Sequence, residues 1–243
     1  MDDIPMAQRT HSRGAGTQSA SNRLSSAIAL ICFVAVVGLA LLLLGRRFGV
    51  ILPAPVPGLQ ARISSDGRLL GHFPYPEADP KTMVAVGPGL LLRPDAAERF
   101  IEMERAAAAA GVNLVPLSAF RSRSVQNQLF FDVKADRNQP SIERAKVSAP
   151  PGFSEHSTGY AIDIGDGSLP QANLTPMFAK TTAYQWLKDN AARFQFVLSF
   201  PEQNPQGVNF EPWHWRYEGS TDALRLFEPA QRLVKQRNGQ VQP

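Results

Sequence analysis

Two of the four histidines lie in segments that also carry acidic side chains. His156 precedes Asp163 in one segment, and His214 follows Glu211 by three residues in another. Two imidazoles and one carboxylate form a common zinc set in catalytic sites, where a fourth position stays open for water. His156, Asp163 and His214 are therefore candidate zinc ligands. The spacing leaves a second interpretation open, in which each histidine is a buried polar group hydrogen-bonded to a nearby acid.

The segment between the first two candidate ligands is suited to present both at one place. If this stretch is extended, the side chains of Ala161 and Asp163 share one face of a strand. Ala161 is small enough to leave room for a metal ion, and Gly159 lets the backbone turn after His156. We therefore expect a turn followed by a strand.

Glu211 needs a bend in the chain if it is to act beside His214. In an unbroken strand, residues three apart point to opposite faces, so Glu211 would face away from His214. Pro212 disfavours an unbroken strand, and a bend there would turn the carboxylate toward the metal. A carboxylate next to a zinc-activated water is a suitable general base. Trp213 and Trp215 would then lie opposite His214 and anchor the strand in the core.

Three motifs of polar and small residues follow one another along the chain. They are Ser118-Ala-Phe-Arg121-Ser122 followed by Gln126, then Ser154-x-His156-x-x-Gly159-x-Ala161-x-Asp163, then Glu211-x-Trp213-His214-x-Arg216. Over about residues 70–220 the sequence resembles the D-alanyl-D-alanine carboxypeptidases of the VanY type. Their wider group also holds lysostaphin-like peptidases and the hedgehog signalling domain. Phe120 departs from the pattern, because the family usually has Tyr at this position.

The resemblance implies a role for each residue that matches a motif position. It implies that His156, Asp163 and His214 bind zinc. It implies Glu211 as the catalytic base and Arg121 as the arginine that binds the scissile carbonyl oxygen.

Four further polar residues of the motifs and their neighbourhood have weaker assignments. Ser154 resembles a residue near the terminal groups of the substrate. Gln126 is either a hydrogen-bonding residue of the substrate pocket or a helix residue packed beneath it. Arg123 and Arg216 are interpreted as solvated side chains or as structural ion-pair partners.

The activity that the resemblance implies is zinc-dependent removal of the terminal D-alanine from peptidoglycan stem peptides. A peptidoglycan endopeptidase or a D-Ala-D-Ala dipeptidase with the same zinc site is an alternative. A non-catalytic wall-binding module is another. Glu211 and Arg121 disfavour that last alternative, because binding alone requires no base.

The succession of elements predicts an α+β domain with a small antiparallel sheet flanked by helices, and the resemblance makes it hedgehog/DD-peptidase-like. Pro94 and the acids after it open a helix that Gly111 ends. Further helices are expected at 123–134, 181–192 and 221–236. Strands are expected at 112–117, 194–199 and 213–217, and a long loop at 135–153.

The N-terminal part predicts a membrane anchor. Residues 1–23 are polar and predict a disordered cytoplasmic tail, and 24–45 predict one transmembrane helix. Its apolar core, Ala27–Leu44, is 18 residues long, or about 27 Å as a helix. That length nearly matches a bilayer core of about 30 Å. A cleaved signal peptide is the alternative, but no convincing cleavage site follows.

The remaining chain divides into a linker and one catalytic domain. We expect residues 46–60 to form a Pro-rich linker and 61–243 to form the zinc peptidase domain. Since the implied substrate lies in the cell wall, we expect a single-pass protein of the cytoplasmic membrane. Its catalytic domain would lie on the outer side, facing the periplasm or cell wall.

Composition excludes two other classes of protein. The net charge is +4, and residues 1–47 hold five arginines and two aspartates, so the body of the chain is nearly neutral. A nucleic-acid partner is therefore not expected, because such binding needs a basic face. The single cysteine has no partner, which excludes a disulfide scaffold.

Overall fold

The computed structural model describes residues 56–237 and 239. The predicted tail, the predicted transmembrane anchor and most of the linker lie outside these residues. The chain divides into two compact units, Met1–Leu52 and Pro53–Pro243, and the described elements all belong to the second. Among the described residues, no helix combines the length and the apolar character needed to cross a membrane.

The core of the second unit contains a four-stranded antiparallel sheet with the strand order β3-β4-β6-β5. Its strands are β3 (Leu114–Ser118), β4 (Ala161–Asp166), β5 (Phe196–Leu198) and β6 (His214–Tyr217). A separate antiparallel pair is formed by β1 (Val84–Gly87) and β2 (Leu90–Leu92). These strands, together with the helices around them, confirm the α+β class with a small antiparallel sheet.

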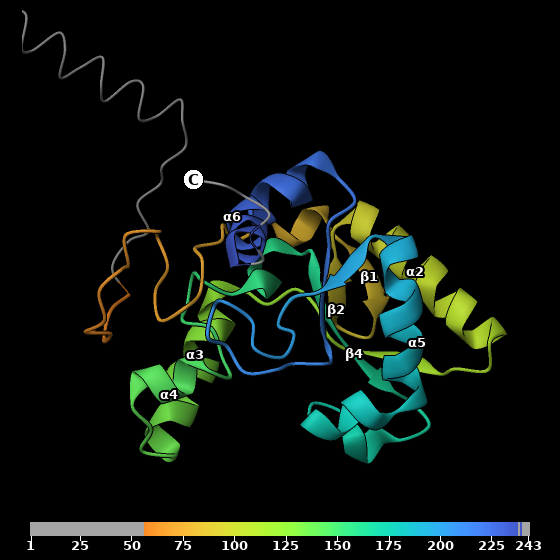
Figure 1. Ribbon diagram of the computed structural model, residues 1–243, viewed down its shortest axis with the longest axis horizontal. Coiled ribbons are helices and arrows are strands. Elements are labelled where there is room, and N and C mark those ends of the chain that lie inside the picture. The colour runs from red at the N-terminus through yellow and green to blue at the C-terminus, as the bar shows by residue number, and fades with distance from the viewer. Residues whose placement is uncertain (1–55, 238, 240–243) are drawn as a thin grey trace, which may run out of the picture. The chain divides into compact units, whose positions relative to one another are not determined.

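Within residues 56–237, five α-helices surround the sheet, and short 3-10 turns connect several elements (Figure 1). The helices are α2 (Pro94–Ala109), α3 (Arg123–Asp136), α4 (Ser141–Ala145), α5 (Thr182–Asn190) and α6 (Thr221–Arg237). The 3-10 turns are η1 (Pro80–Thr82), η2 (Glu155–Thr158), η3 (Pro170–Ala172), η4 (Pro176–Lys180) and η5 (Ala191–Phe194). In Figure 1, α3 and α4 lie on the opposite side of β4 from α2 and α5.

The helix boundaries follow the local signals, with one correction. α2 begins at Pro94, which has no N–H to lose in the first turn, and Asp95 accepts a hydrogen bond from the N–H of Ala96. The expected loop over 135–153 is wrong at α4. This helix follows Pro140 and has only five residues, so it is too short for a hydrophobic period to reveal it.

The central strands separate an apolar face from a polar one. Ile162 and Ile164 of β4 lie in the hydrophobic core with Trp215 and Tyr217 of β6, and α2, α5 and α6 pack their apolar side chains against them. Because side chains alternate along a strand, Asp163 lies on the other face. The sheet thus presents polar groups to one side while its other side forms the core.

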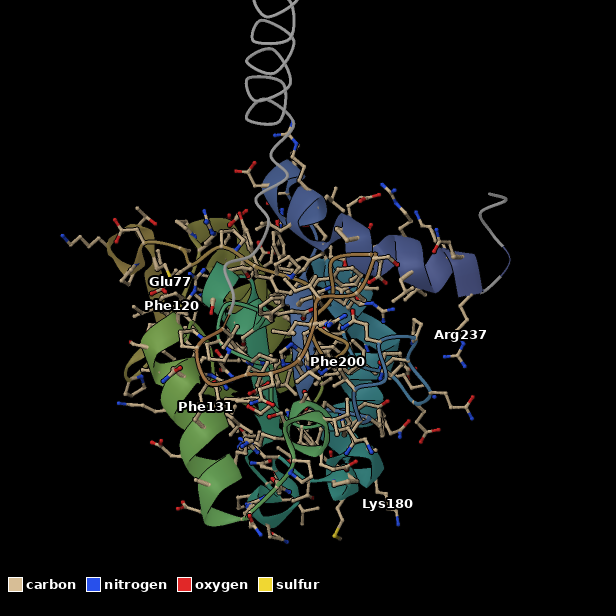
Figure 2. The ribbon with its side chains drawn as sticks, turned by 90° about the vertical axis from the view of Figure 1, so that its left-hand side faces the viewer. Glu77, Phe120, Phe131, Lys180, Phe200 and Arg237 are labelled. Atoms are coloured by element: carbon tan, nitrogen blue, oxygen red, sulfur yellow. The ribbon has the colours of Figure 1, made fainter. Side chains whose placement is uncertain are left out.

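Phe200 covers part of the polar side of the sheet. Phe200, which follows β5, is only 5% exposed and lies among the interior side chains in Figure 2, whereas Lys180 and Arg237 extend outward. The ring of Phe200 lies 5.0 Å from that of His214 and 6.2 Å from that of His72. The ring of Phe200 thus covers the sheet next to His214 and His72.

Candidate metal centre

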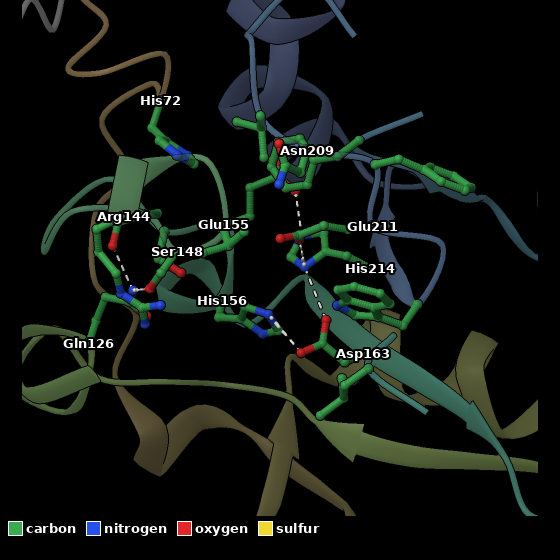
Figure 3. Close-up of a pocket in the computed structure, with 18 of the residues that line it drawn as sticks. His72, Gln126, Arg144, Ser148, Glu155, His156, Asp163, Asn209, Glu211 and His214 are labelled. Atoms are coloured by element: carbon green, nitrogen blue, oxygen red, sulfur yellow. Dashed lines mark hydrogen bonds and ion pairs between the residues drawn. The ribbon is translucent and has the colours of Figure 1, made fainter. Parts of the chain in front are cut away.

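Strand register brings two of the candidate ligands together. Asp163 of β4 pairs directly with His214 of β6, at the centre of the sheet. His156 lies on η2, the turn that immediately precedes β4. One ligand atom from each of these three buried residues lies within 4.8 Å of the other two. Residues that are 58 positions apart in the chain thus surround one point, as Figure 3 shows.

Gly159 makes the turn between His156 and β4. Its φ is +73°, in the left-handed region that side chains with a Cβ disfavour. A Cβ at this position would lie 2.8 Å from the terminal methyl carbon of Met83 and 3.2 Å from Cγ of Arg93. The glycine thus satisfies both the conformation and the close packing, as the expected turn requires.

The imidazole of His156 is held with Nε2 directed at the cluster. The carbonyl oxygen of Ala119 can only accept, so Nδ1 of His156 donates to it over 2.8 Å. Nε2 then faces Oδ2 of Asp163 at 3.4 Å. Burial, with the nearby charge of Arg121, lowers the pKa of His156 to about 4. The ring is therefore neutral near pH 7, which is the form that binds a metal.

The imidazole of His214 lies between two carboxylates. Its Nδ1 is 3.1 Å from Oδ1 of Asp163, and its Nε2 is 3.0 Å from Oε2 of Glu155. Burial alone would lower the pKa of His214, but these two hydrogen bonds outweigh burial and raise it to about 10. With Nε2 bonded to Glu155, Nδ1 is the atom that faces the cluster.

Glu155 is a residue to which the sequence analysis assigned no role. It is 3% exposed, and its carboxylate accepts hydrogen bonds from Ser199 at 2.6 Å and from Arg216 at 2.9 Å. Burial would raise the pKa of Glu155, but Arg216 and His214 lower it to about 2. Arg216 is thus a structural ion-pair partner, in agreement with one of its two interpretations. The sequence does contain one indication of this acid. Arg216 lies in a strand that is expected to be buried, and a buried arginine needs an acidic partner nearby.

Glu211 approaches the cluster because the chain turns before β6. The strand begins only at His214, whose backbone N–H donates to the carbonyl of Glu211 at 3.0 Å. This turn places Oε2 of Glu211 4.0 Å from Nδ1 of His214. Burial raises the pKa of Glu211 to about 8. Trp215 lies in the core as expected, whereas Trp213 both packs against the core and lines the cavity.

Arg121 contributes a positive charge next to the three candidate ligands. One guanidinium nitrogen lies 3.8 Å from Oδ2 of Asp163, and another donates to Oε1 of Gln126 at 3.0 Å. The amide nitrogen of Gln126 donates to Ser148 and to the carbonyl of Ala149. Because both ends of this amide are already bonded within the protein, the geometry favours a positioning role for Gln126.

All seven residues predicted from the sequence line a single cavity of about 790 Å³. Ser154, which is 3% exposed, lies in its wall. The cavity is also lined by residues that the sequence analysis did not assign to it, which include His72, Arg137, Arg144, Asn209 and Phe210. Figure 3 shows Asp163, His156, His214 and Glu211 grouped at one part of this cavity.

The donor set of the cluster fits a zinc ion. Two imidazoles and one carboxylate are ligands that zinc takes in catalytic sites, and each imidazole is fixed by a hydrogen bond from its other nitrogen. The negative charge of Asp163 lies between the two rings, which favours a cation at this point.

Comparison with protein families gives one match that spans more than half of the chain. The model of the VanY family, described as D-alanyl-D-alanine carboxypeptidase, matches residues 89–220. The matched residues include all seven predicted site residues and the four strands of the central sheet.

Individual relatives agree with this match. A D-alanyl-D-alanine carboxypeptidase of Enterococcus faecalis (strain ATCC 700802 / V583) is 31% identical over 132 residues, which are 50% of this chain and 46% of the relative. The chain spans less than half the length of each of the first three curated relatives it matches.

Solved structures share the fold. The structure of VanYB in complex with D-Ala-D-Ala is 26% identical, with a TM-score of 0.54, over 70% of this chain and 94% of VanYB. A vancomycin-resistance D,D-pentapeptidase VanY in complex with Zn(II) is 23% identical, with a TM-score of 0.53, over 67% of this chain and 94% of that one.

Proposed function

Since this chain belongs to the VanY family of D-alanyl-D-alanine carboxypeptidases, we propose that it is a zinc peptidase that removes the terminal D-alanine from peptidoglycan stem peptides. The observation that carries the proposal is the convergence of His156, Asp163 and His214 beside the largely buried carboxyl group of Glu211. The ligands named for VanYB and for the VanY pentapeptidase, D-Ala-D-Ala and Zn(II), support the same substrate and metal.

His156, Asp163 and His214 would hold the zinc ion through Nε2, a carboxylate oxygen and Nδ1, respectively. At such a site, zinc supplies Lewis-acid polarisation of the scissile carbonyl and activation of a water molecule. Glu155 keeps His214 in the correct tautomer, because its carboxylate binds the opposite ring nitrogen.

Glu211 moves the proton in this mechanism. A positive charge at the three ligands would favour the ionised form of its carboxyl group, against the effect of burial. The ionised carboxylate takes a proton from the attacking water and then transfers it to the amine of the departing D-alanine.

Arg121 stabilises the negative charge that develops on the carbonyl oxygen. Its guanidinium is partly buried, lies next to Asp163 and is oriented by Gln126. Removing one donor of this kind typically lowers the rate by about 10²–10³-fold.

A comparison of three substrates tests the reaction and separates it from the two alternative hydrolases. The zinc-loaded protein is given a stem pentapeptide ending in D-Ala-D-Ala, free D-Ala-D-Ala and cross-linked peptidoglycan. We expect release of D-alanine from the pentapeptide to be the fastest reaction. Preferred cleavage of the free dipeptide or of the cross-links would instead identify a dipeptidase or an endopeptidase. Zinc-dependent binding of the wall without cleavage would identify a binding module.

For its place in the cell, we propose a single-pass protein whose catalytic domain lies outside the cytoplasmic membrane. Support comes from the apolar run Ala27–Leu44 and from the location of the proposed substrate in the wall. The test uses a reporter enzyme that functions only outside the cytoplasm. When it is fused after Pro243, it should show activity. Activity of a cytoplasm-specific reporter at the same position would contradict this topology.

A further inference from the structure

A buried cation without an acidic partner lies in the wall of the cavity. Arg144, in α4, is only 8% exposed. One terminal nitrogen of its guanidinium donates to the carbonyl of Leu129 at 2.8 Å, while its buried Nε has no hydrogen-bond partner. A buried charge is costly unless it is paired, so this side chain is suited to receive an anion.

A second arginine lies near Arg144 and adds to the positive charge. Arg137 lines the same cavity and is exposed. Among the described residues, no carboxylate lies within 4.0 Å of a guanidinium nitrogen of either arginine. Burial and the charge of Arg137 both lower the pKa of Arg144. Two positive charges therefore lie close together in this wall. Among the described residues, neither has a carboxylate as an ion-pair partner.

The two arginines share a continuous wall with the candidate metal centre. Arg121, next to Asp163, bonds to Gln126, and Gln126 bonds to Ser148, four residues after Arg144. In Figure 3, Arg144 lies on the side of Gln126 and Ser148, away from Asp163 and His214. A peptide that reaches the metal centre can thus extend along this wall to Arg144.

Two carboxylates next to the candidate ligands are already engaged. Asp163 contacts both histidines, and Glu155 contacts His214 and Arg216. The anion that compensates Arg144 must therefore come from outside this set. A guanidinium binds a carboxylate through two parallel hydrogen bonds, so a carboxylate matches it in both charge and shape.

We propose that Arg144 and Arg137 form a binding subsite for a carboxylate group of the peptide substrate. This inference rests on the proposed peptidase function. The carboxylate has two possible sources, which are the C-terminus of the leaving residue and an acidic residue on the N-terminal side of the scissile bond. Either source makes Arg144 a determinant of specificity.

Two pairs of synthetic pentapeptides ending in D-Ala-D-Ala distinguish the sources. The first pair differs only at the C-terminus, which is a free acid or an amide. The second pair differs only at the third residue, which is diaminopimelate with its free carboxylate or lysine without one. Dissociation constants are measured by calorimetry on the zinc-loaded full chain that carries Glu211→Gln, so that no peptide is cleaved.

We expect the carboxylate-bearing peptide of one pair to bind at least about 10-fold more tightly, because a charge-assisted hydrogen bond is lost in its partner. Adding Arg144→Met should abolish this preference, and Arg144→Lys should retain part of it. Arg232→Met, which removes an exposed arginine paired with Glu228 on α6, is the control and should leave the preference unchanged. Arg137→Gln is a second test, for the case that Arg144→Met does not fold. Because the side chain of Arg137 is exposed, this variant should fold, and it should weaken the preference.

The subsite is refuted if neither pair shows a preference, or if the preference survives in Arg137→Gln and in a folded Arg144→Met protein. These outcomes are independent of turnover. Failure of the zinc-loaded wild type to release D-alanine would refute the proposed function, while an Arg144-dependent binding preference would still support the subsite.

Discussion

Asp163 contacts both candidate histidine ligands, one with each carboxylate oxygen. Oδ2 lies 3.4 Å from Nε2 of His156, and Oδ1 lies 3.1 Å from Nδ1 of His214. Burial would raise the pKa of Asp163, but His156 and His214 hold it well below its usual range. A permanently ionised carboxylate between two imidazoles is an arrangement suited to a divalent cation.

Glu155 determines how His214 faces this carboxylate. We predict that Glu155→Gln lowers zinc affinity by about 10- to 100-fold, the usual effect of losing an outer hydrogen-bond partner of a ligand. Competition with a chromogenic chelator measures the affinity. Glu218→Gln is a matched control, because Glu218 also pairs with Arg216 but is not a partner of His214. An equal loss in both variants would assign the effect to the ion pair with Arg216 and not to His214.

The same carboxylate gives the stability of the zinc-free protein a defined pH dependence. The pKa of Glu155 is about 2 in the folded protein, against an ordinary value of 4.5. As pH falls, the unfolded chain therefore binds this proton first. The stabilisation is complete above about pH 4.5 and is lost as pH falls toward 2.

Urea unfolding at several pH values tests this dependence. The wild type should exceed Glu155→Gln by about 3–5 kcal/mol near pH 7, the cost of breaking a buried ion pair. The difference should shrink between pH 4.5 and 2. Glu102→Gln, which breaks an exposed pair with Arg99, should have little effect throughout. A difference between wild type and Glu155→Gln that stays constant down to pH 2 would contradict the assigned pKa.

At the scale of elements, the turn at Gly159 connects η2 to β4 and so sets the position of His156 relative to Asp163. We predict that Gly159→Ala destabilises the protein by more than the roughly 1–2 kcal/mol that a Cβ costs in the left-handed region. The excess arises because the new Cβ would meet Met83 and Arg93. Zinc affinity should fall as well.

Gly111→Ala provides the control for that substitution. Gly111 has a similar φ of +74°, but nothing lies within 4 Å of the Cβ that would be added. Thermal unfolding should therefore show a smaller loss in Gly111→Ala, and its zinc affinity should be unchanged. Equal losses of stability and affinity in the two variants would mean that crowding at Gly159 does not position the ligand.

Some of these elements could be predicted from the sequence, because their signals are local. Pro94 begins α2, and the bend at Pro212 turns Glu211 toward His214. Short elements such as α4 lack enough residues to show a period. The pairing of Asp163 with His214 depends on strand register, which a single sequence does not specify.

In the molecule as a whole, the motif residues could be predicted from the sequence, but the cavity around them could not. His72, Arg144 and Glu155 all line this cavity. None of them has a role that the motifs indicate. Their importance arises from burial and from contacts between distant segments, such as that of His72 with the carbonyl of Ala145 at 2.7 Å. No local pattern encodes such contacts. The predicted N-terminal anchor remains a prediction, because it lies outside the described residues.

The proposed mechanism requires that three side chains hold one zinc ion while Glu211 acts as the base. The most direct measurement is bound zinc together with D-alanine release from a stem pentapeptide, for the wild type, Glu211→Ala and His214→Ala. We expect one zinc and activity in the wild type, one zinc without activity in Glu211→Ala, and neither in His214→Ala. Near-wild-type release by Glu211→Ala, or one tightly bound zinc in His214→Ala, would contradict the proposed mechanism.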